Sequence, residues 1–233
     1  MLKHHVILIL LACLRLSILF QLSHQAHKFQ NDVNKFKLYV LVFSKTCSKN
    51  SNFKNNRTGF FVHRRLVSAV KRIEFVSDRL SYIVLRGRWL HIILVNMHAP
   101  SEEKSEELKD SFYEELEEVF DHIPKYHMKI LLGDFNAKVG REDIFKPIIG
   151  QESLHQDSND KGVRIVKFAT SKNLVVKSTM FPHRNIHKYT WTSPDGKTHN
   201  QIDHVLIDRR WQSSALDVRS FRGAECDTDH CKG

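Results

Sequence analysis

The chain has 233 residues, of which 41% are hydrophobic and 27% charged, and it carries a formal net charge of +10 at pH 7. This length and apolar content suffice for a domain with a real core, and they exclude collagen-like, low-complexity and wholly disordered proteins. The basic balance favours a polyanionic partner, either nucleic acid or a phospholipid surface. The four cysteines lack CxxC spacing, so neither a disulfide framework nor a zinc site is expected.

Residues 1–58 differ in character from the remainder of the chain. A short basic start precedes an apolar run at residues 6–14, which has the length of a signal-peptide core and is too short to span a membrane without interruption. Two interpretations stay open: a signal-like segment over residues 1–26 that would direct the chain to the secretory route, and an unrelated leader. The polar, basic stretch that follows predicts a linker, within which apolar residues 38–43 predict one strand.

From residue 59 onward, apolar runs of strand length appear. Residues 60–62 and 82–85 predict two strands, and residues 89–95 form a longer run of the kind that is buried on both faces of a sheet. We therefore expect a leader and linker over residues 1–58 and one folded domain over residues 59–233.

The strongest helix signal follows Ser101, a candidate N-cap, and ends at Pro124. Residues 102–121 contain ten acidic residues and two lysines, a net −8, which leaves about +18 on the rest of the chain. This acidic run is either the solvated back of an amphipathic helix or an acidic interaction surface. Glu115 lies outside the apolar stripe of that helix. The stripe consists of Leu108, Phe112, Leu116, Val119, Phe120 and Ile123.

The second half of the domain repeats the alternation of strands and helices. Residues 129–132 predict a buried strand, a second helix is expected after Asn159, and residues 174–176 predict another strand. Residues 189–191 and 201–207 predict two further strands.

The turn signal Pro194-Asp195-Gly196 is expected to join those two strands, and residues 216–221 predict a last strand. Because helices fall between strands along the chain, we expect an α/β fold in which sheets are covered by helices.

Gly133-Asp134-Phe135-Asn136, at the end of a predicted buried strand, is the first candidate for chemistry. The Asp134 carboxylate can act on a metal or an attacking water. Asn136, two residues on, points to the same side and can donate its amide to a phosphoryl oxygen. The alternative is an Asx turn that only ends the strand.

Three further polar positions lie at or near predicted strand ends. Asp203 lies in an apolar strand and needs a partner, because a buried unpaired charge costs several kcal/mol or more. An imidazole such as His230, which follows Asp229, would satisfy it. His204 is expected to be a packing residue. His98, after the strand around residue 95, is either a phosphate contact or a structural histidine.

Together, these motifs in this order resemble the endonuclease/exonuclease/phosphatase superfamily of Mg²⁺-dependent phosphodiesterases. Residues 59–230, about three quarters of the chain, are most similar to retrotransposon-derived craniofacial development protein 2-like proteins and to non-LTR retrotransposon endonuclease domains. The resemblance implies a four-layer α/β sandwich that hydrolyses DNA phosphodiesters with Mg²⁺ or Mn²⁺. It also implies DNA as the partner, no stable membrane span, and a nuclear location.

The resemblance implies a role for each matching residue of this sequence. Asp134 would activate water or donate protons, Asn136 would position the scissile phosphate, and Asp203 would orient His230. His230 would contact the phosphate, as would His98. Asp229 would bind the metal, and Trp191 would either lie near the DNA or pack in the core.

Two departures from the family pattern matter. The family places a Gln-Glu pair, whose Glu is the principal metal ligand, before the position of Gly59, yet residues 1–58 contain no Glu. The strand that should follow His230 also has no counterpart. We therefore expect a domain truncated at both ends, a weakly bound metal and an impaired endonuclease. A non-catalytic nucleic-acid-binding or protein-interaction remnant is the alternative.

Overall fold

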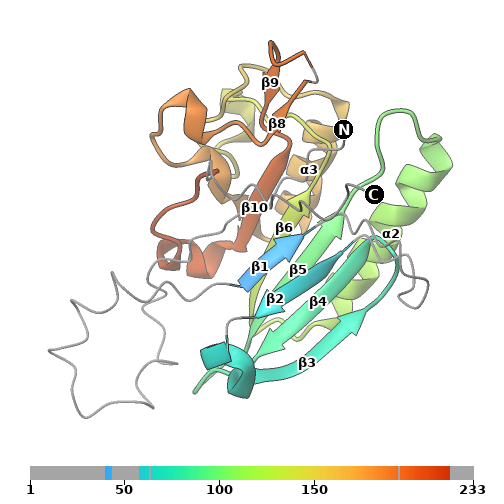
Figure 1. The fold of residues 1–233 in the computed structure, drawn as a ribbon, viewed down its shortest axis with the longest axis vertical. Coiled ribbons are helices and arrows are strands. Elements are labelled where there is room, and N and C mark those ends of the chain that lie inside the picture. Colours follow the sequence, from blue (N-terminus) through green and yellow to red (C-terminus); the bar gives the residue numbers. More distant parts are fainter. Residues whose placement is uncertain (1–39, 44–57, 63, 194, 221–233) are drawn as a thin grey trace, which may run out of the picture.

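The computed structural model describes residues 40–43, 58–62, 64–193 and 195–220. A six-stranded sheet runs through their centre in the order β3-β4-β5-β6-β10-β7, with β5 and β6 parallel and every other neighbouring pair antiparallel (Figure 1). The strands are β3 (Val70–Phe75), β4 (Leu80–Leu85), β5 (Ile92–His98), β6 (Met128–Asp134), β7 (Leu174–Val176) and β10 (Asp203–Asp208).

β5 and β6 form the middle of the sheet because their sequences are almost continuously apolar. Every residue of β5 is buried, and so is every residue of β6 except Asp134. Strands of this composition are stable only where both faces of the sheet are covered. The expectation that residues 89–95 form one buried run was wrong at its start, because β5 begins at Ile92 and the Trp89 side chain is 77% exposed.

Two helices cover one face of the sheet: α2 (Glu106–His122) and α3 (Asp160–Ser171). Their apolar side chains share one core with alternate residues of the strands, and the rings of Phe120 and Phe168 meet edge to face at 5.3 Å. α3 begins at Asp160, close to the predicted start, and Asn159 caps it, because its side chain accepts a hydrogen bond from the amide of Gly162.

The predicted start of the first helix was wrong, since the N-cap position is Ser105 and not Ser101. Leu108, placed in the stripe by its spacing, is 56% exposed, while Lys109 is buried and pairs with Glu106 at 2.7 Å. The first turn of α2 therefore projects beyond the core. Five of the six predicted stripe residues are buried: Phe112, Leu116, Val119, Phe120 and Ile123.

A second core lies on the opposite face of the sheet. There β2 (Gly59–Val62) pairs antiparallel with β1 (Val40–Phe43), and Phe60 and Val62 pack against the sheet. β1 confirms residues 40–43 of the strand predicted at residues 38–43, and the first two lie outside the described residues. Two 3₁₀ helices border this face, η2 (Arg64–Ala69) and η6 (Arg209–Ser214).

The last third of the described chain pairs differently from the prediction. The turn around Gly196 joins two short strands, β8 (Trp191–Thr192) and β9 (His199–Asn200), which form a separate hairpin. β10 instead enters the central sheet between β6 and β7. Residues 216–220 form no strand, contrary to the prediction for residues 216–221. Short 3₁₀ helices complete this region: η3 (Asp143–Phe145), η4 (Lys177–Thr179) and η5 (Asn185–His187).

The predicted α/β class is confirmed. A helical layer, the six-stranded sheet and the β1–β2 pair lie one on another, with cores between them. Within the described residues, no helix combines the length and the apolar character that crossing a membrane requires. The signal-like segment over residues 1–26 and the predicted Asp229 and His230 lie outside the described residues.

Candidate active site

One edge of the central sheet collects three of the predicted polar residues. The register pairs His98 at the end of β5 with Asp134 at the end of β6, and it pairs Asp134 with Asp203 at the start of β10. Neighbouring strands lie about 4.8 Å apart, so the three side chains form a row across adjacent strands. We call this row, together with Asn136, the candidate edge.

Gly133 and Asn136 shape the chain at the candidate edge. Gly133 has a φ of 136°, and a Cβ atom there would lie 2.0 Å from the Met97 carbonyl oxygen, so only glycine lets β6 approach β5 this closely. Asn136 adopts a left-handed conformation with a φ of 48°, which asparagine tolerates better than most residues. The strand thus ends in a sharp turn that leaves Asp134 partly exposed.

Both carboxylate oxygens of Asp134 have a protein contact. Oδ1 accepts a hydrogen bond from the Asn136 amide at 3.0 Å, which is the Asx turn that the sequence left open as an alternative. Oδ2 lies 3.2 Å from His98 Nδ1, at ion-pair distance but outside hydrogen-bond geometry. The Asn136 side chain donates to the Ala99 carbonyl at 2.8 Å. The turn therefore also fixes the carboxylate and the amide in place.

His98 is held on both sides of its backbone. Its amide donates to the Arg79 carbonyl at 2.9 Å, and Arg79 Nη1 donates to the His98 carbonyl at 3.2 Å. The His98 side chain is only 7% exposed and that of Asp134 is 13% exposed. The imidazole is thus buried beside the carboxylate while the carboxylate reaches the surface.

Asp203 is buried where β10 begins. The Thr190 hydroxyl accepts hydrogen bonds from the amides of Ile202 and Asp203, at 2.9 and 3.1 Å, and the Phe135 amide donates to the Ile202 carbonyl at 3.0 Å. These bonds tie the start of β10 to the turn after β6. They fix Asp203 next to Asp134 even though the hairpin prediction for this region was wrong.

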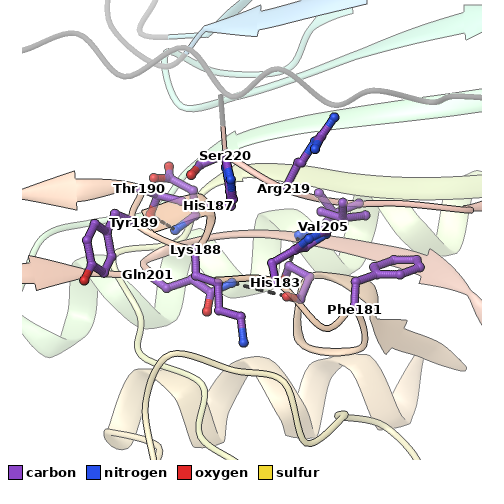
Figure 2. A pocket seen from close by; sticks show the side chains of 13 residues that line it. Phe181, His183, His187, Lys188, Tyr189, Thr190, Gln201, Val205, Arg219 and Ser220 are labelled. Atoms are coloured by element: carbon purple, nitrogen blue, oxygen red, sulfur yellow. Dashed lines mark hydrogen bonds between the residues drawn. The ribbon is translucent and has the colours of Figure 1, made fainter. Parts of the chain in front are cut away.

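Asp203 also lines a pocket of about 60 Å³ together with His187 and Lys188 (Figure 2). Gln201 lines it and donates to the Ser178 carbonyl at 3.2 Å, while the buried Lys188, also in the lining, places its Nζ 3.4 Å from Glu152 Oε2. Such a volume holds a few water molecules. The pocket forms part of the surroundings of Asp203.

His204, the residue after Asp203, is structural, as expected. Its ring nitrogens lie 3.0 Å from the Ser178 hydroxyl and 3.0 Å from the Ala137 carbonyl. Since a carbonyl only accepts, Nε2 carries the proton and Nδ1 accepts from Ser178. Burial lowers the pKa of His204 to about 4, so the ring is neutral near pH 7.

Trp191 lies in β8, opposite Asn200, and is half-buried. It directly follows Thr190, whose hydroxyl accepts a hydrogen bond from the Asp203 amide, so Trp191 lies close in the chain to the start of β10. An exposed part of the indole is compatible with the expectation of DNA contact, and its buried part is compatible with packing.

Arg79 and Lys161 are cations near the candidate edge that the sequence did not indicate. Arg79 reaches His98 from the turn between β3 and β4, and the Lys161 ammonium donates to the Pro100 carbonyl at 3.2 Å and pairs with Glu102. Neither lies in a motif. Only the register that pairs Leu80 with Met97 brings Arg79 to this edge, and the sequence did not specify that register.

The donor chemistry of the candidate edge suits a hard divalent cation only in part. Asp134 and Asp203 supply carboxylate oxygens on neighbouring strands, and Mg²⁺ is commonly held by one or two carboxylates together with water and phosphate oxygens. Among the described residues, however, no three His, Cys, Asp or Glu side chains are arranged to hold a metal ion. The described residues can thus contribute ligands to a metal without enclosing it.

Comparison of the sequence with known proteins finds the same protein in two species. Over 184 residues, 79% of this chain, the sequence is 31% identical to craniofacial development protein 2 of Bos taurus, and it is equally similar to that protein of Tragulus javanicus. The chain spans about a third of the length of these relatives, 31% and 32% respectively. No protein-family model matches the chain.

Similar solved structures are more distant in sequence. The endonuclease domain of TRAS1, a telomere-specific non-LTR retrotransposon, has a TM-score of 0.49 at 12% identity, covering 78% of this chain and 75% of that domain. The AP endonuclease LMAP of Leishmania major also has a TM-score of 0.49, at 14% identity, covering 81% of this chain and 67% of the other.

The fold and the candidate edge define a layered α/β domain with a His-Asp-Asp row at the end of its central strands. Over the matched 184 residues, this chain is a homologue of craniofacial development protein 2. The resemblance to craniofacial development protein 2-like proteins that the motifs predicted is thereby confirmed.

Proposed function

We propose that the chain hydrolyses DNA phosphodiesters at the candidate edge, as a retrotransposon-derived endonuclease of reduced activity. One observation carries the proposal: His98, Asp134 and Asp203 occupy matched positions on three adjacent strands, with Asn136 fixed beside them. A basic chain supports a polyanionic substrate, and the sequence resemblance supports the type of reaction.

Each residue takes the role for which its contacts suit it. Asp134 is partly exposed beside His98, so it is placed to take a proton from an attacking water. Asn136 retains one amide hydrogen beyond its bond to Ala99 for a phosphoryl oxygen. Asp203 is buried beside Asp134 and orients an imidazole, for which His230 is the proposed partner.

A divalent metal completes the proposed site. Asp229 is its proposed ligand, with water and phosphate oxygens as the remainder. Once bound, Mg²⁺ or Mn²⁺ neutralises charge that develops on the phosphate. Residues 1–58 supply no Glu, so we propose that the metal binds weakly and that this 233-residue chain is a slow enzyme. A group misplaced by about 1 Å can lose on the order of a hundredfold in rate.

A non-catalytic nucleic-acid-binding protein is the second candidate function. It is favoured by the absence of a three-ligand metal cluster among the described residues, together with the basic charge outside residues 102–121. The two candidates differ in one outcome, because only the first predicts broken phosphodiester bonds.

Nicking of supercoiled plasmid separates them. Purified chain is incubated with Mg²⁺ or with EDTA, next to the variants Asp134→Ala and His98→Ala. A matched control, Asp143→Ala, removes an exposed carboxylate from η3. Slow nicking that requires Mg²⁺, persists in the control and is lost in both variants supports the enzyme. Binding of plasmid without nicking in any preparation would favour the second candidate.

A further inference from the structure

The end of the sheet opposite the candidate edge carries a concentration of cations and aromatic rings. The register pairs Val70 with Leu85, Leu85 with Ile92, and Ile92 with Met128, so the residues flanking these strand ends lie side by side. β10 also ends here, beside the start of β6. We call this surface the basic edge. It consists of Lys71, Arg86, Arg88, Trp89, Lys125, Tyr126, Arg209 and Arg210.

Two large aromatic side chains of the basic edge are open to solvent. Trp89 is 77% exposed and Tyr126 is 63% exposed. The Arg88 guanidinium lies over the Trp89 ring at 5.1 Å from its centroid, a cation–π contact. Exposed aromatic residues of this size, interleaved with cations, mark an interaction surface more often than a random surface position does.

A stacked histidine pair, buried His127 and half-buried His91, lies between the two aromatic residues in the strand-end segments. The rings of His91 and His127 stack with centroids 4.7 Å apart, and the His91 amide donates to His127 Nδ1 at 3.1 Å. The Tyr126 ring lies 4.0 Å from the His127 ring, while Lys71 Nζ lies 3.1 Å from His91 Nε2. Trp89 and Tyr126 therefore project from adjacent strand ends that are fixed to each other.

Two carboxylates near the basic edge, Asp208 and Asp121, are already paired with cations. Asp208 is buried and pairs with Arg210 at 2.5 Å, and Arg210 also donates to the Lys125 carbonyl. Asp121, near the end of α2, pairs with Lys172 at 2.7 Å. Burial lowers the pKa of His91, and the nearby Lys71 and Arg86 lower it further, in keeping with a positive local field.

We propose that the basic edge binds single-stranded nucleic acid, with unpaired bases stacked on Trp89 and Tyr126 and phosphates paired with the surrounding cations. Stacking needs an open ring face, which unpaired bases can reach and the stacked bases of a duplex cannot. The edge spans five neighbouring strands, roughly 19 Å, or about five nucleotides at stacked spacing.

An anionic membrane is the competing occupant, since aromatic residues and cations also gather at lipid surfaces. The observations favour nucleic acid, because binding to a membrane surface relies on a broad apolar face. Here the exposed rings are separated by cations, and Leu90, beside Trp89, is packed partly inward against the core.

This inference does not depend on the proposed hydrolysis. β5 and β6 have seven residues each, so the basic edge lies roughly 20 Å from the candidate edge. A strand held here would be a second contact of the chain with nucleic acid.

Fluorescence anisotropy of labelled 12-mers tests the proposal on the full chain, with oligothymidylate and oligouridylate as single strands and a DNA duplex of equal length. The variant Arg88→Ala/Trp89→Ala removes one cation and one aromatic ring, and Tyr126→Ala is a second, independent variant. The control Lys167→Ala/Leu108→Ala removes an exposed cation and an exposed apolar side chain from the helices. Thermal melts by circular dichroism establish that each variant is folded.

We expect both basic-edge variants to bind single strands about tenfold more weakly than the control, in line with the contribution of one stacked base. The DNA and RNA arms show which strand is preferred. Equal affinities of the basic-edge variants and the control would overturn the proposal, as would tighter binding of the duplex than of either single strand. Binding to phosphatidylserine vesicles that depends on Trp89, without such dependence for oligonucleotides, would assign the surface to membranes instead.

Discussion

Gly133 shows how a single residue controls the candidate edge. A side chain there would collide with the Met97 carbonyl. Gly133 and Met97 belong to β6 and β5, the two central strands of the sheet, and neither strand can shift without disturbing its neighbours. The positions of Asp134 and Asn136 at the end of β6 therefore depend on Gly133. Its role becomes clear only from the register that pairs β6 with β5.

Replacing Gly133 by alanine should destabilise the fold by about 3 kcal/mol or more, because backbone strain and a backbone collision add up. Gly196→Ala is the matched control: its φ is also positive, at 74°, but nothing lies within 4 Å of the added Cβ. That control should lose only about 1–2 kcal/mol. Urea denaturation measures both, and equal losses would contradict the close approach of the two strands.

His204 should make stability depend on pH. The unfolded chain binds a proton near the ordinary histidine pKa of 6.5, whereas the folded chain does so only near 4. Because the fold disfavours the protonated form of His204, its contribution to the free energy of unfolding is fully present above pH 6.5. This contribution is lost as the pH falls towards 4. Linkage gives about 3 kcal/mol over this window.

The variant His204→Gln keeps a side-chain donor and cannot titrate. Its free energy of unfolding should fall less between pH 7 and pH 4.5 than that of the wild type. His91, His127 and His155, whose pKa values are also lowered by burial, remain in both proteins and cancel in the comparison. Parallel pH profiles for the two proteins would mean that His204 is not buried in its neutral form.

At the scale of elements, α2 rests on one narrow apolar stripe. Phe112→Asp places a carboxylate among the buried residues of this helix, which costs several kcal/mol against a total stability of about 5–15, so the domain should unfold. Glu117→Lys changes an exposed position of the same helix and should leave the melting temperature nearly unchanged. Glu115 is less suitable as a control, because it accepts a hydrogen bond from Ser77 at 2.9 Å. Similar melts for both variants would place the helix in another register.

Elements with a strong period were predictable, and their pairing was not. The apolar runs of β6 and β7 and the capped start of α3 carry local signals that the structure confirms. The true cap of α2 at Ser105 and the hairpin of β8 with β9 depend on which side chains reach a core, and that is a tertiary effect. Trp89 was misplaced for the same reason, because its hydrophobicity alone suggested burial.

The strand-end positions of several candidate residues were predictable from the sequence, their geometry was not, and their roles stay predictions. Asp134, Asp203 and His98 stood at or near predicted strand ends, and the structure brings them into one row, with Asn136 beside it. Arg79 was missed because a turn far away in sequence delivers it. The predicted roles of Asp229 and His230 lie outside the described residues and stay predictions.

For the whole molecule, charge should govern DNA binding. About +18 lies outside residues 102–121, so affinity for duplex DNA should fall steeply with salt, with a slope of about −0.9 for each phosphate neutralised. The dissociation constant measured from low to physiological salt tests this expectation. A flat response would mean that phosphate contacts do not dominate.

The rate of plasmid nicking under excess protein tests the central claim, that hydrolysis occurs at the candidate edge, most directly. The comparison includes the wild type, Asp134→Ala, and Arg88→Ala/Trp89→Ala, each with Mg²⁺ and with EDTA. We predict slow nicking by the wild type that EDTA abolishes, loss of at least a hundredfold in Asp134→Ala, and a persistent signal in the basic-edge variant. Nicking by Asp134→Ala at the wild-type rate, or no Mg²⁺-dependent nicking by the wild type, would contradict the account.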